Sequence, residues 1–241
     1  MFPSVQYLLL QVRNAHDPMR QQEVRCFARA LGCDLSQIRV WDLISGIPSQ
    51  TLLDSVDVVL LGGSGDYSVA EGGPWLSEAL EGMRELYTCD KPTFASCWGF
   101  QAMARALGGS VVTDLSRAEL GTHLLYVTRE GQHDPVFGPL GDAFLAQMGH
   151  QDIVVELPPG AVLLASSERV ANQAFCFPNK PIYCTQFHPE LRRNDLVERL
   201  KAYPQYVELI AGTSIAEFAE TCRDTPEAEA LLPRFIQHVL A

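Results

Sequence analysis

A cysteine, a histidine and a carboxylate are the side chains of this sequence that could act together on an acyl carbon. Cys97 follows an apolar run at residues 92–95 and precedes a helical stretch at residues 100–107. His188 comes 91 residues later, at the end of a β-type run, and Glu190 stands two positions after it. A thiol becomes a strong nucleophile when a histidine takes its proton, and a carboxylate can hold that imidazole in the productive tautomer. These residues predict nucleophilic catalysis by Cys97, with His188 as base and Glu190 as its orienting group.

The surroundings of Cys97 are typical of a nucleophile elbow, a sharp turn between a strand and a helix that exposes the nucleophile. Small residues lie on both sides of it, which such a turn needs because backbone passes close to backbone. Free N–H groups at the start of the following helix favour a thiolate and a developing oxyanion. The alternative, a buried structural thiol, is our interpretation of the other cysteines: Cys26, Cys33, Cys89, Cys176, Cys184 and Cys222.

A glycine-rich loop follows the apolar run at residues 56–61 and offers candidates for an oxyanion-binding group. Gly62 and Gly63 could form no more than a turn after a strand. In the functional interpretation, the backbone N–H of Gly63 joins that of Trp98 to hold a tetrahedral oxyanion. Loss of one such donor typically costs about 3 kcal/mol of barrier.

Three segments together resemble the class I, or triad-type, glutamine amidotransferases. Residues 97–101 are similar to the C-x-G-x-Q signature of that family, and residues 188–190 to its H-P-E signature. Residues 60–65 resemble its glycine-rich oxyanion loop. All three occur in the order of the family and at roughly its spacing. The resemblance implies that Cys97, His188 and the carboxylate after it form the catalytic triad of an amidotransferase.

The resemblance also implies a set of substrate-binding residues. The glutamine of the C-x-G-x-Q signature, here Gln101, contacts the substrate in the family, and Gly62 belongs to the loop beside it. His150 and Asp152 resemble the S-H-x-D segment of GMP-synthase-type members, which lies near the glutamine pocket. Gly149 stands where those proteins have serine.

Apolar strands alternate with amphipathic helices around the first two motifs. The expected strands are residues 6–12, 37–42, 56–61 and 92–95, and the expected helices are residues 18–31, 74–87 and 100–107. Such β–α alternation predicts an open, mostly parallel sheet with helices on both faces, the flavodoxin-like architecture that the resemblance also implies. Short strands between residues 111 and 186, separated by Gly and Pro, predict a mixed or antiparallel extension of this α/β fold.

We find no internal repeat and no low-complexity linker, so the sequence predicts a single amidotransferase-like domain over residues 1–241. Residues 192–212 indicate one polar helical segment, and a shorter helix with a capping box follows at residues 214–222. Together, residues 191–225 form a helical insertion before the last helix. The insertion carries no motif, and a lid, a partner surface and simple decoration are all open interpretations.

The composition excludes some classes of partner. The net charge of −11 and the lack of a basic run argue against a nucleic-acid partner. The apolar run at residues 5–12 is far too short to span a bilayer, so we expect no membrane partner. Seven cysteines with no C-x-x-C pair argue against a disulfide framework or a zinc site. We therefore expect no metal and a reduced, cytoplasmic setting.

The favoured functional hypothesis is hydrolysis of the glutamine side-chain amide through a γ-glutamyl thioester on Cys97, which releases glutamate and ammonia. This chemistry requires no metal or organic cofactor. The sequence has no P-loop, no nucleotide fingerprint and no room for a synthetase domain, so the ammonia acceptor would be a synthetase in trans. The alternative is a hydrolase of γ-glutamyl peptides or conjugates with the same three residues. A second alternative is a catalytically silent binding or regulatory module.

Overall fold

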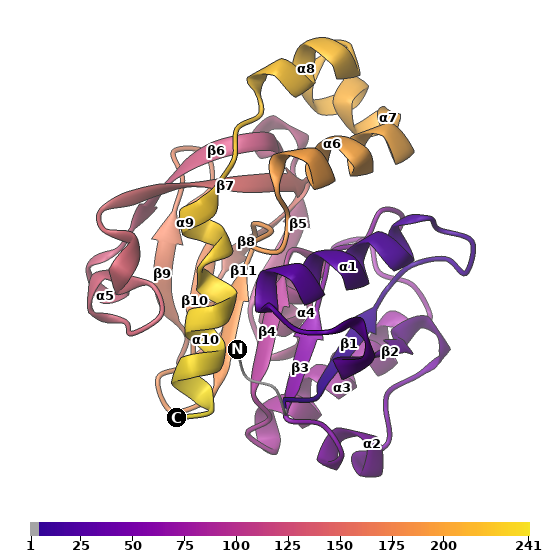
Figure 1. The fold of residues 1–241 in the computed structure, drawn as a ribbon, viewed down its shortest axis with the longest axis vertical. Coiled ribbons are helices and arrows are strands. Elements are labelled where there is room, and N and C mark those ends of the chain that lie inside the picture. Colours follow the sequence, from indigo (N-terminus) through magenta and orange to yellow (C-terminus); the bar gives the residue numbers. More distant parts are fainter. Residues whose placement is uncertain (1–4) are drawn as a thin grey trace.

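Strands and helices alternate through the first half of the computed structural model, which describes residues 5–241 (Figure 1). The strands are β1 (Tyr7–Gln11), β2 (Ile38–Asp42), β3 (Val58–Leu61), β4 (Thr93–Ser96), β5 (Ser110–Thr113), β6 (Glu119–Val127), β7 (Ala143–His150), β8 (Asp152–Glu156), β9 (Val162–Ser166), β10 (Ala174–Cys176) and β11 (Ile182–Thr185). The α-helices are α1 (Met19–Leu31), α2 (Gln50–Asp54), α3 (Leu76–Thr88), α4 (Trp98–Ala106), α5 (Arg129–His133), α6 (Arg193–Ala202), α7 (Pro204–Tyr206), α8 (Ile215–Thr221), α9 (Pro226–Glu229) and α10 (Leu231–Val239). Short 3₁₀ turns are η1 (Leu35–Gln37), η2 (Leu43–Ser45), η3 (Leu115–Arg117) and η4 (Gly138–Leu140), and η5 (Val207–Ala211) is a π-helical turn.

The main sheet joins a parallel half to an antiparallel half. Among the described residues its strand order is β2-β1-β3-β4-β11-β10-β9-β6-β7. Neighbouring strands from β2 to β11 run parallel, and those from β11 to β7 run antiparallel. A separate antiparallel pair is formed by β5 and β8. The predicted α/β fold, with its parallel sheet and antiparallel extension, is confirmed.

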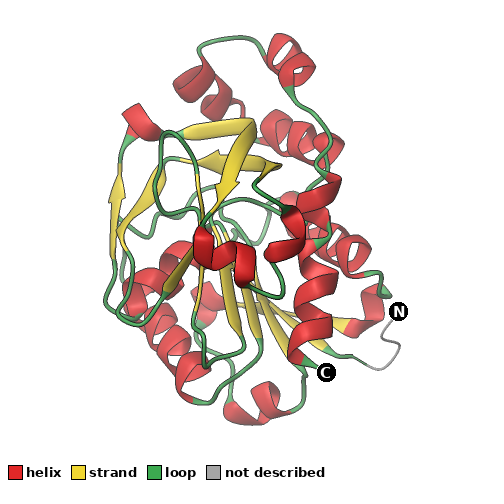
Figure 2. Ribbon diagram, turned by 90° about the vertical axis from the view of Figure 1, so that its left-hand side faces the viewer, coloured by secondary structure: helices red, strands yellow, loops and turns green. Residues whose placement is uncertain are grey.

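Helices cover both faces of the parallel half, as Figure 2 shows from the side. The strands β1 and β3 are buried along their whole length, because one face of each lies under α1 and α10 and the other under α3 and α4. Phe27 and Phe235 pack in the first layer, and Met83 and Phe100 in the second. No helix in residues 5–241 has both the length and the apolar character to cross a bilayer.

The segment at residues 191–225 folds into several short helices that lie together at one end of the molecule (Figure 1). The expectation of one continuous helix over residues 192–212 was wrong. The helix α6 ends before Tyr203, whose extended backbone (φ −126°, ψ 64°) reflects the proline that follows it. The apolar side chains Leu196, Leu200 and Phe218 of this segment form a cluster of their own with Leu120 of β6.

Candidate active site

Cys97 occupies the sharp turn between β4 and α4. Its backbone lies at φ 52° and ψ −102°, a region that L-residues rarely adopt and that costs about 1–3 kcal/mol. The Cys97 N–H donates to the Thr185 carbonyl at 2.8 Å, and the Gly99 N–H donates to the Gly62 carbonyl at 3.2 Å. A Cβ atom on Gly99 would lie 2.5 Å from the Leu61 Cβ atom, which explains why the turn needs glycine there. The elbow is therefore strained locally and held by its neighbours on two strands.

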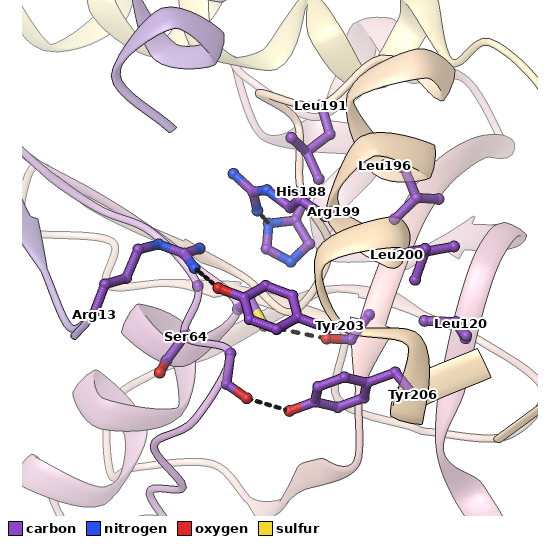
Figure 3. Close-up of a pocket in the computed structure, with 14 residues that line it drawn as sticks. Arg13, Ser64, Leu120, His188, Leu191, Leu196, Arg199, Leu200, Tyr203 and Tyr206 are labelled. Carbon is purple, nitrogen blue, oxygen red and sulfur yellow. Dashed lines mark hydrogen bonds between the residues drawn. The ribbon is translucent and has the colours of Figure 1, made fainter. Parts of the chain in front are cut away.

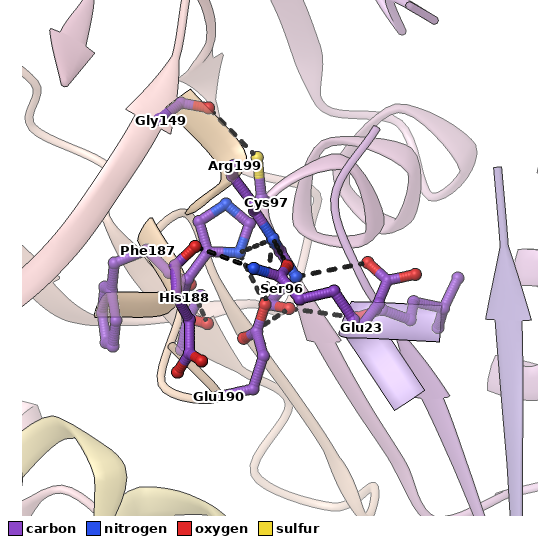
Figure 4. A network of polar contacts seen from close by, with 12 residues as sticks. Glu23, Ser96, Cys97, Gly149, Phe187, His188, Glu190 and Arg199 are labelled. Atoms are coloured by element: carbon purple, nitrogen blue, oxygen red, sulfur yellow. Dashed lines mark hydrogen bonds and ion pairs between the residues drawn. The ribbon is translucent and has the colours of Figure 1, made fainter. Parts of the chain in front are cut away.

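His188 and Glu190 form a buried pair beside this elbow (Figure 4). The His188 Nδ1 atom lies 2.7 Å from the Glu190 Oε1 atom, and the His188 N–H donates to the Gln147 carbonyl at 2.9 Å. A hydrogen bond from Nδ1 fixes the ring and leaves its Nε2 atom available for proton transfer. The structure thus brings the histidine and carboxylate of the H-P-E segment to the cysteine.

The charges around His188 favour its protonated form. Burial disfavours the imidazolium, but Glu190 and Cys97 outweigh it through their negative charge and hydrogen bonds, and the pKa of His188 rises to about 9. Burial would raise the pKa of Glu190, but His188 and Arg199 outweigh that effect and lower it. These shifts favour an imidazolium between a carboxylate and the thiol near neutral pH.

Arg199 is a member of this site that the sequence analysis missed. It comes from α6 and is buried, with its Nη1 atom 3.6 Å from Glu190 Oε1 and 3.4 Å from His188 Nδ1. Its Nε–H donates to the Gln22 side chain at 2.8 Å, and its Nη2 atom lies 3.9 Å from Glu23. Because His188 Nδ1 donates to Glu190, the arginine and the histidine both direct their protons at the same carboxylate. A signal existed in the sequence, since Arg199 occupies an apolar position of an amphipathic helix.

Gly63 and Trp98, the predicted oxyanion donors, lie on either side of the Cys97 side chain along the chain and in space. Within residues 5–241, neither backbone N–H donates a hydrogen bond. A Cβ atom built on Gly63 would lie 2.8 Å from the His188 Cε1 atom and 3.6 Å from the Cys97 Cβ atom. Only a glycine lets the backbone approach both side chains so closely.

Gln101, His150 and Asp152 lie at the wall of a pocket beside Cys97, but other side chains already hold their polar groups. Gln101 donates to the Asp152 carbonyl at 2.9 Å, and the His150 Nε2 atom lies 3.1 Å from a carboxylate oxygen of Glu119. The Asp152 carboxylate accepts hydrogen bonds from Ser68, Thr113 and the Ala70 N–H. Asp152 therefore anchors the glycine-rich loop.

Gly62 does not line this pocket. Its Cα atom faces Glu23, and a Cβ atom there would lie 2.2 Å from the Glu23 Oε1 atom. Its carbonyl accepts the elbow hydrogen bond from Gly99. The structure thus gives Gly62 a place behind the site, where it packs against the elbow.

Two pockets meet at Cys97. The first, which we name the polar pocket, has a volume of about 510 Å³, and its lining includes Ser68, Glu71, Trp98, Gln101 and Asp152. The second, the apolar pocket, has a volume of about 470 Å³, and its lining includes Leu120, Leu191, Leu196, Leu200 and Tyr203 (Figure 3). Cys97, Gly149 and Tyr206 border both pockets. The buried indole Nε1–H of Trp98 has no hydrogen-bond partner among the described residues and is available to a ligand.

The family model for class-I glutamine amidotransferases matches residues 15–199. The chain belongs to the class-I glutamine amidotransferase family. The resemblance seen in the sequence motifs is therefore confirmed.

Similar proteins differ in how much of their length this chain covers. A GMP synthase [glutamine-hydrolyzing] from Caldicellulosiruptor saccharolyticus is 39% identical over 108 residues, which cover 45% of this chain and 20% of that protein. Gamma-glutamyl peptidase 3 from Arabidopsis thaliana is 31% identical over 198 residues, covering 78% of this chain and 75% of that protein. The crystal structure of a glutamine amidotransferase from Thermotoga maritima has a TM-score of 0.76 at 21% identity and covers 98% of both chains. The chain thus spans only a fifth of the GMP synthase but most of the peptidase.

Proposed function

We propose that this chain hydrolyses the side-chain amide of glutamine through a γ-glutamyl thioester on Cys97. The observation that carries the proposal is a thiol on a strained elbow beside a buried His188–Glu190 pair, whose Nδ1–Oε1 distance is 2.7 Å. Membership of the class-I amidotransferase family supports the same chemistry.

Acylation begins with the Cys97 sulfur attacking the side-chain carbonyl carbon of the substrate. The Gly63 and Trp98 N–H groups, which donate no hydrogen bond within residues 5–241, stabilise the oxyanion that forms. As the tetrahedral intermediate collapses, His188 gives its proton to the leaving nitrogen and ammonia departs. A γ-glutamyl thioester is left on the sulfur.

Deacylation reverses the roles of these groups. His188, now neutral, takes a proton from a water molecule, and the resulting hydroxide attacks the thioester carbon. The bond between carbon and sulfur breaks, glutamate leaves, and the proton on His188 restores the starting state. Glu190 orients the imidazole in both halves of the cycle.

The ammonia would pass to an acceptor enzyme in trans. The GMP synthases that match this chain are 20% to 30% covered by it, so the chain corresponds to a part of those proteins. We place the partner surface on the rim of the Cys97 pockets, since ammonia must leave there without meeting bulk water.

A second candidate is hydrolysis of a γ-glutamyl peptide or conjugate by the same residues. Two observations favour it. The relative matched over most of both chains is a gamma-glutamyl peptidase. In addition, the apolar pocket beside Cys97 is far larger than an ammonia molecule needs.

The first experiment is release of glutamate by the purified chain from glutamine, with Cys97→Ala as the blank. Turnover that disappears in Cys97→Ala supports the proposal. A glutamine-like electrophile should label Cys97 at a rate that falls strongly in His188→Ala. Absence of both turnover and labelling would overturn the proposal and favour a silent binding module.

A further inference from the structure

The two pockets at Cys97 differ in which catalytic groups they contain. Among the described residues, His188 borders the apolar pocket alone, whereas Gln101 and Asp152 border the polar pocket alone. Cys97 stands at their junction. A substrate attacked by its sulfur must therefore place one part in each pocket.

His188 determines which part goes where. The imidazolium gives its proton to the leaving nitrogen, so that nitrogen must face the apolar pocket. The glutamyl part, with its amino and carboxylate groups, then occupies the polar pocket, where the Trp98 indole N–H is free to bind it. Any substituent on the leaving nitrogen extends into the apolar pocket.

The walls of the apolar pocket suit a neutral, apolar substituent. Four leucines and two tyrosines contribute to its lining: Leu120, Leu191, Leu196, Leu200, Tyr203 and Tyr206. Two arginines also reach it, but both are already paired. Arg13 lies 3.1 Å from both Asp17 and Glu23, and Arg199 lies 3.6 Å from Glu190. No described charge is thus left to meet a charged substituent.

The insertion builds most of this pocket and is fastened to the rest of the site. The Tyr203 hydroxyl donates to Asp17 and accepts from Arg13, and the Tyr206 hydroxyl donates to the Gly65 carbonyl at 2.9 Å. These bonds hold the pocket walls against the glycine-rich loop. The pocket is therefore a fixed feature, with a volume of about 470 Å³ in the range of small-molecule sites.

We propose that the substrates of this chain are γ-glutamyl amides of neutral, apolar primary amines, and that the insertion at residues 191–225 provides the leaving-group site. The proposal rests on the thioester chemistry proposed above. The Cys97 sulfur forms a bond to the γ-carbonyl carbon, the carbon–nitrogen bond breaks, and His188 protonates the leaving amine. Water then hydrolyses the thioester, so one amide and one water give glutamate and the free amine.

The test compares leaving groups on the purified chain. The substrates are glutamine, the γ-glutamyl ethyl-, butyl- and pentylamides, and the γ-glutamyl amide of 1,4-diaminobutane, which matches the pentylamide in length but ends in a cation. We expect kcat/KM to rise about fourfold per buried methylene along the alkyl series. The cationic amide should be at least tenfold poorer than the pentylamide.

Variants localise the effect. Leu200→Phe should fill the pocket and lower the ratio of pentylamide to ethylamide kcat/KM by about tenfold, and Leu120→Phe should do the same from the opposite wall if the first variant does not fold. Leu209→Phe is the matched control, because Leu209 belongs to the same insertion, is 56% exposed and lines neither pocket. The control should keep the wild-type ratio.

The outcomes separate the two proposals. Hydrolysis of glutamine with no gain along the alkyl series, or with equal use of the cationic amide, overturns the leaving-group proposal and leaves the thioester chemistry standing. Hydrolysis of none of the amides, with no labelling of Cys97, overturns both.

Discussion

The guanidinium of Arg199 lies 3.6 Å from the carboxylate of Glu190, so a cation from the insertion stands directly behind the histidine of the site (Figure 4). The line of charge continues on the far side, where Arg199 approaches Glu23 at 3.9 Å and Arg13 pairs with Glu23 at 3.1 Å. These side chains are buried. The alternation of charges allows two carboxylates to stay ionised away from water.

Replacement of Arg199 by methionine should affect both stability and pH dependence. It leaves Glu190 paired with His188 alone, so the imidazolium is held more tightly and the pKa of His188 rises. We expect the alkaline limit of kcat/KM to move to higher pH, and the free energy of unfolding to fall by roughly 3 kcal/mol. Arg199→Lys keeps the charge but loses the bond from Nε to Gln22, and should lie between the two.

A matched control for this variant exists on the same helix pair. Arg25 pairs with Glu198 of α6 at 3.9 Å, and both side chains are more than half exposed. Arg25→Met should cost less than about 1 kcal/mol, because exposed ion pairs contribute little. Urea unfolding and pH–rate profiles of the three variants decide the matter. An Arg199→Met protein that behaves like Arg25→Met would contradict the positioning role.

The pKa of His188 sets an upper limit on the pH of catalysis. Acylation uses the imidazolium as proton donor, so kcat/KM should fall as pH rises through about 9. Because this pKa exceeds the ordinary value of 6.5, the stabilisation from the bound proton is complete below about pH 6.5 and is lost as pH rises towards 9. Glu190→Gln removes the main group that raises the pKa, and burial then lowers it. The alkaline limit of that variant should move towards neutrality.

Ser96→Ala is the control for the pH experiment. The Ser96 hydroxyl lies 3.3 Å from the Glu190 carboxylate, so its removal changes one hydrogen-bond partner and no charge. Its alkaline limit should stay near that of the wild type. Equal limits for Ser96→Ala and Glu190→Gln would show that charge does not govern the titration of His188.

Gly63→Ala tests the close approach of the oxyanion loop to the catalytic groups. The added Cβ atom would lie 2.8 Å from the imidazole of His188, so the ring or the loop must move. We expect kcat/KM to fall by about 10²-fold or more, as for loss of one oxyanion donor. Gly149→Ala is the steric control for thermal unfolding, since its Cβ atom would meet nothing closer than 4.0 Å. Wild-type activity in Gly63→Ala would refute the arrangement.

The sequence predicted the parallel half of the sheet well because its strands are continuous apolar runs between amphipathic helices. Strand β7 was missed, although it pairs with β6 over most of its length. Its sequence, Ala143–His150, contains no β-branched residue, so local preference gave no signal. Pairing with a neighbour distant in sequence determines such a strand, and a local pattern cannot show it.

The motifs brought Cys97 and His188 together before any coordinates did, because fixed spacings accompany that chemistry. Arg199 could not be assigned in the same way. A charged residue on an amphipathic helix is ordinarily solvated, and only the packing of α6 against Gln22 and Glu190 reveals that this one is buried. Likewise, the apolar pocket depends on how the insertion folds back over β6, which no motif encodes.

The strained backbone of Cys97 predicts an unusual order of stability among its variants. Glycine adopts positive φ freely, whereas alanine keeps the strain of about 1–3 kcal/mol that the cysteine bears at φ 52°. At an ordinary position, replacing alanine by glycine costs about 1 kcal/mol through the entropy of the unfolded chain.

The relief of strain should exceed this cost, so Cys97→Gly should be more stable than Cys97→Ala by about 1 kcal/mol in urea unfolding. Ala216→Gly, at an exposed position of the helix α8, reports the ordinary cost in the same protein. If the change from alanine to glycine at position 97 destabilises the fold as much as Ala216→Gly does, the elbow stores no strain. If the order is reversed as expected, the packing of β4 and α4 holds the nucleophile in a conformation that its own backbone disfavours.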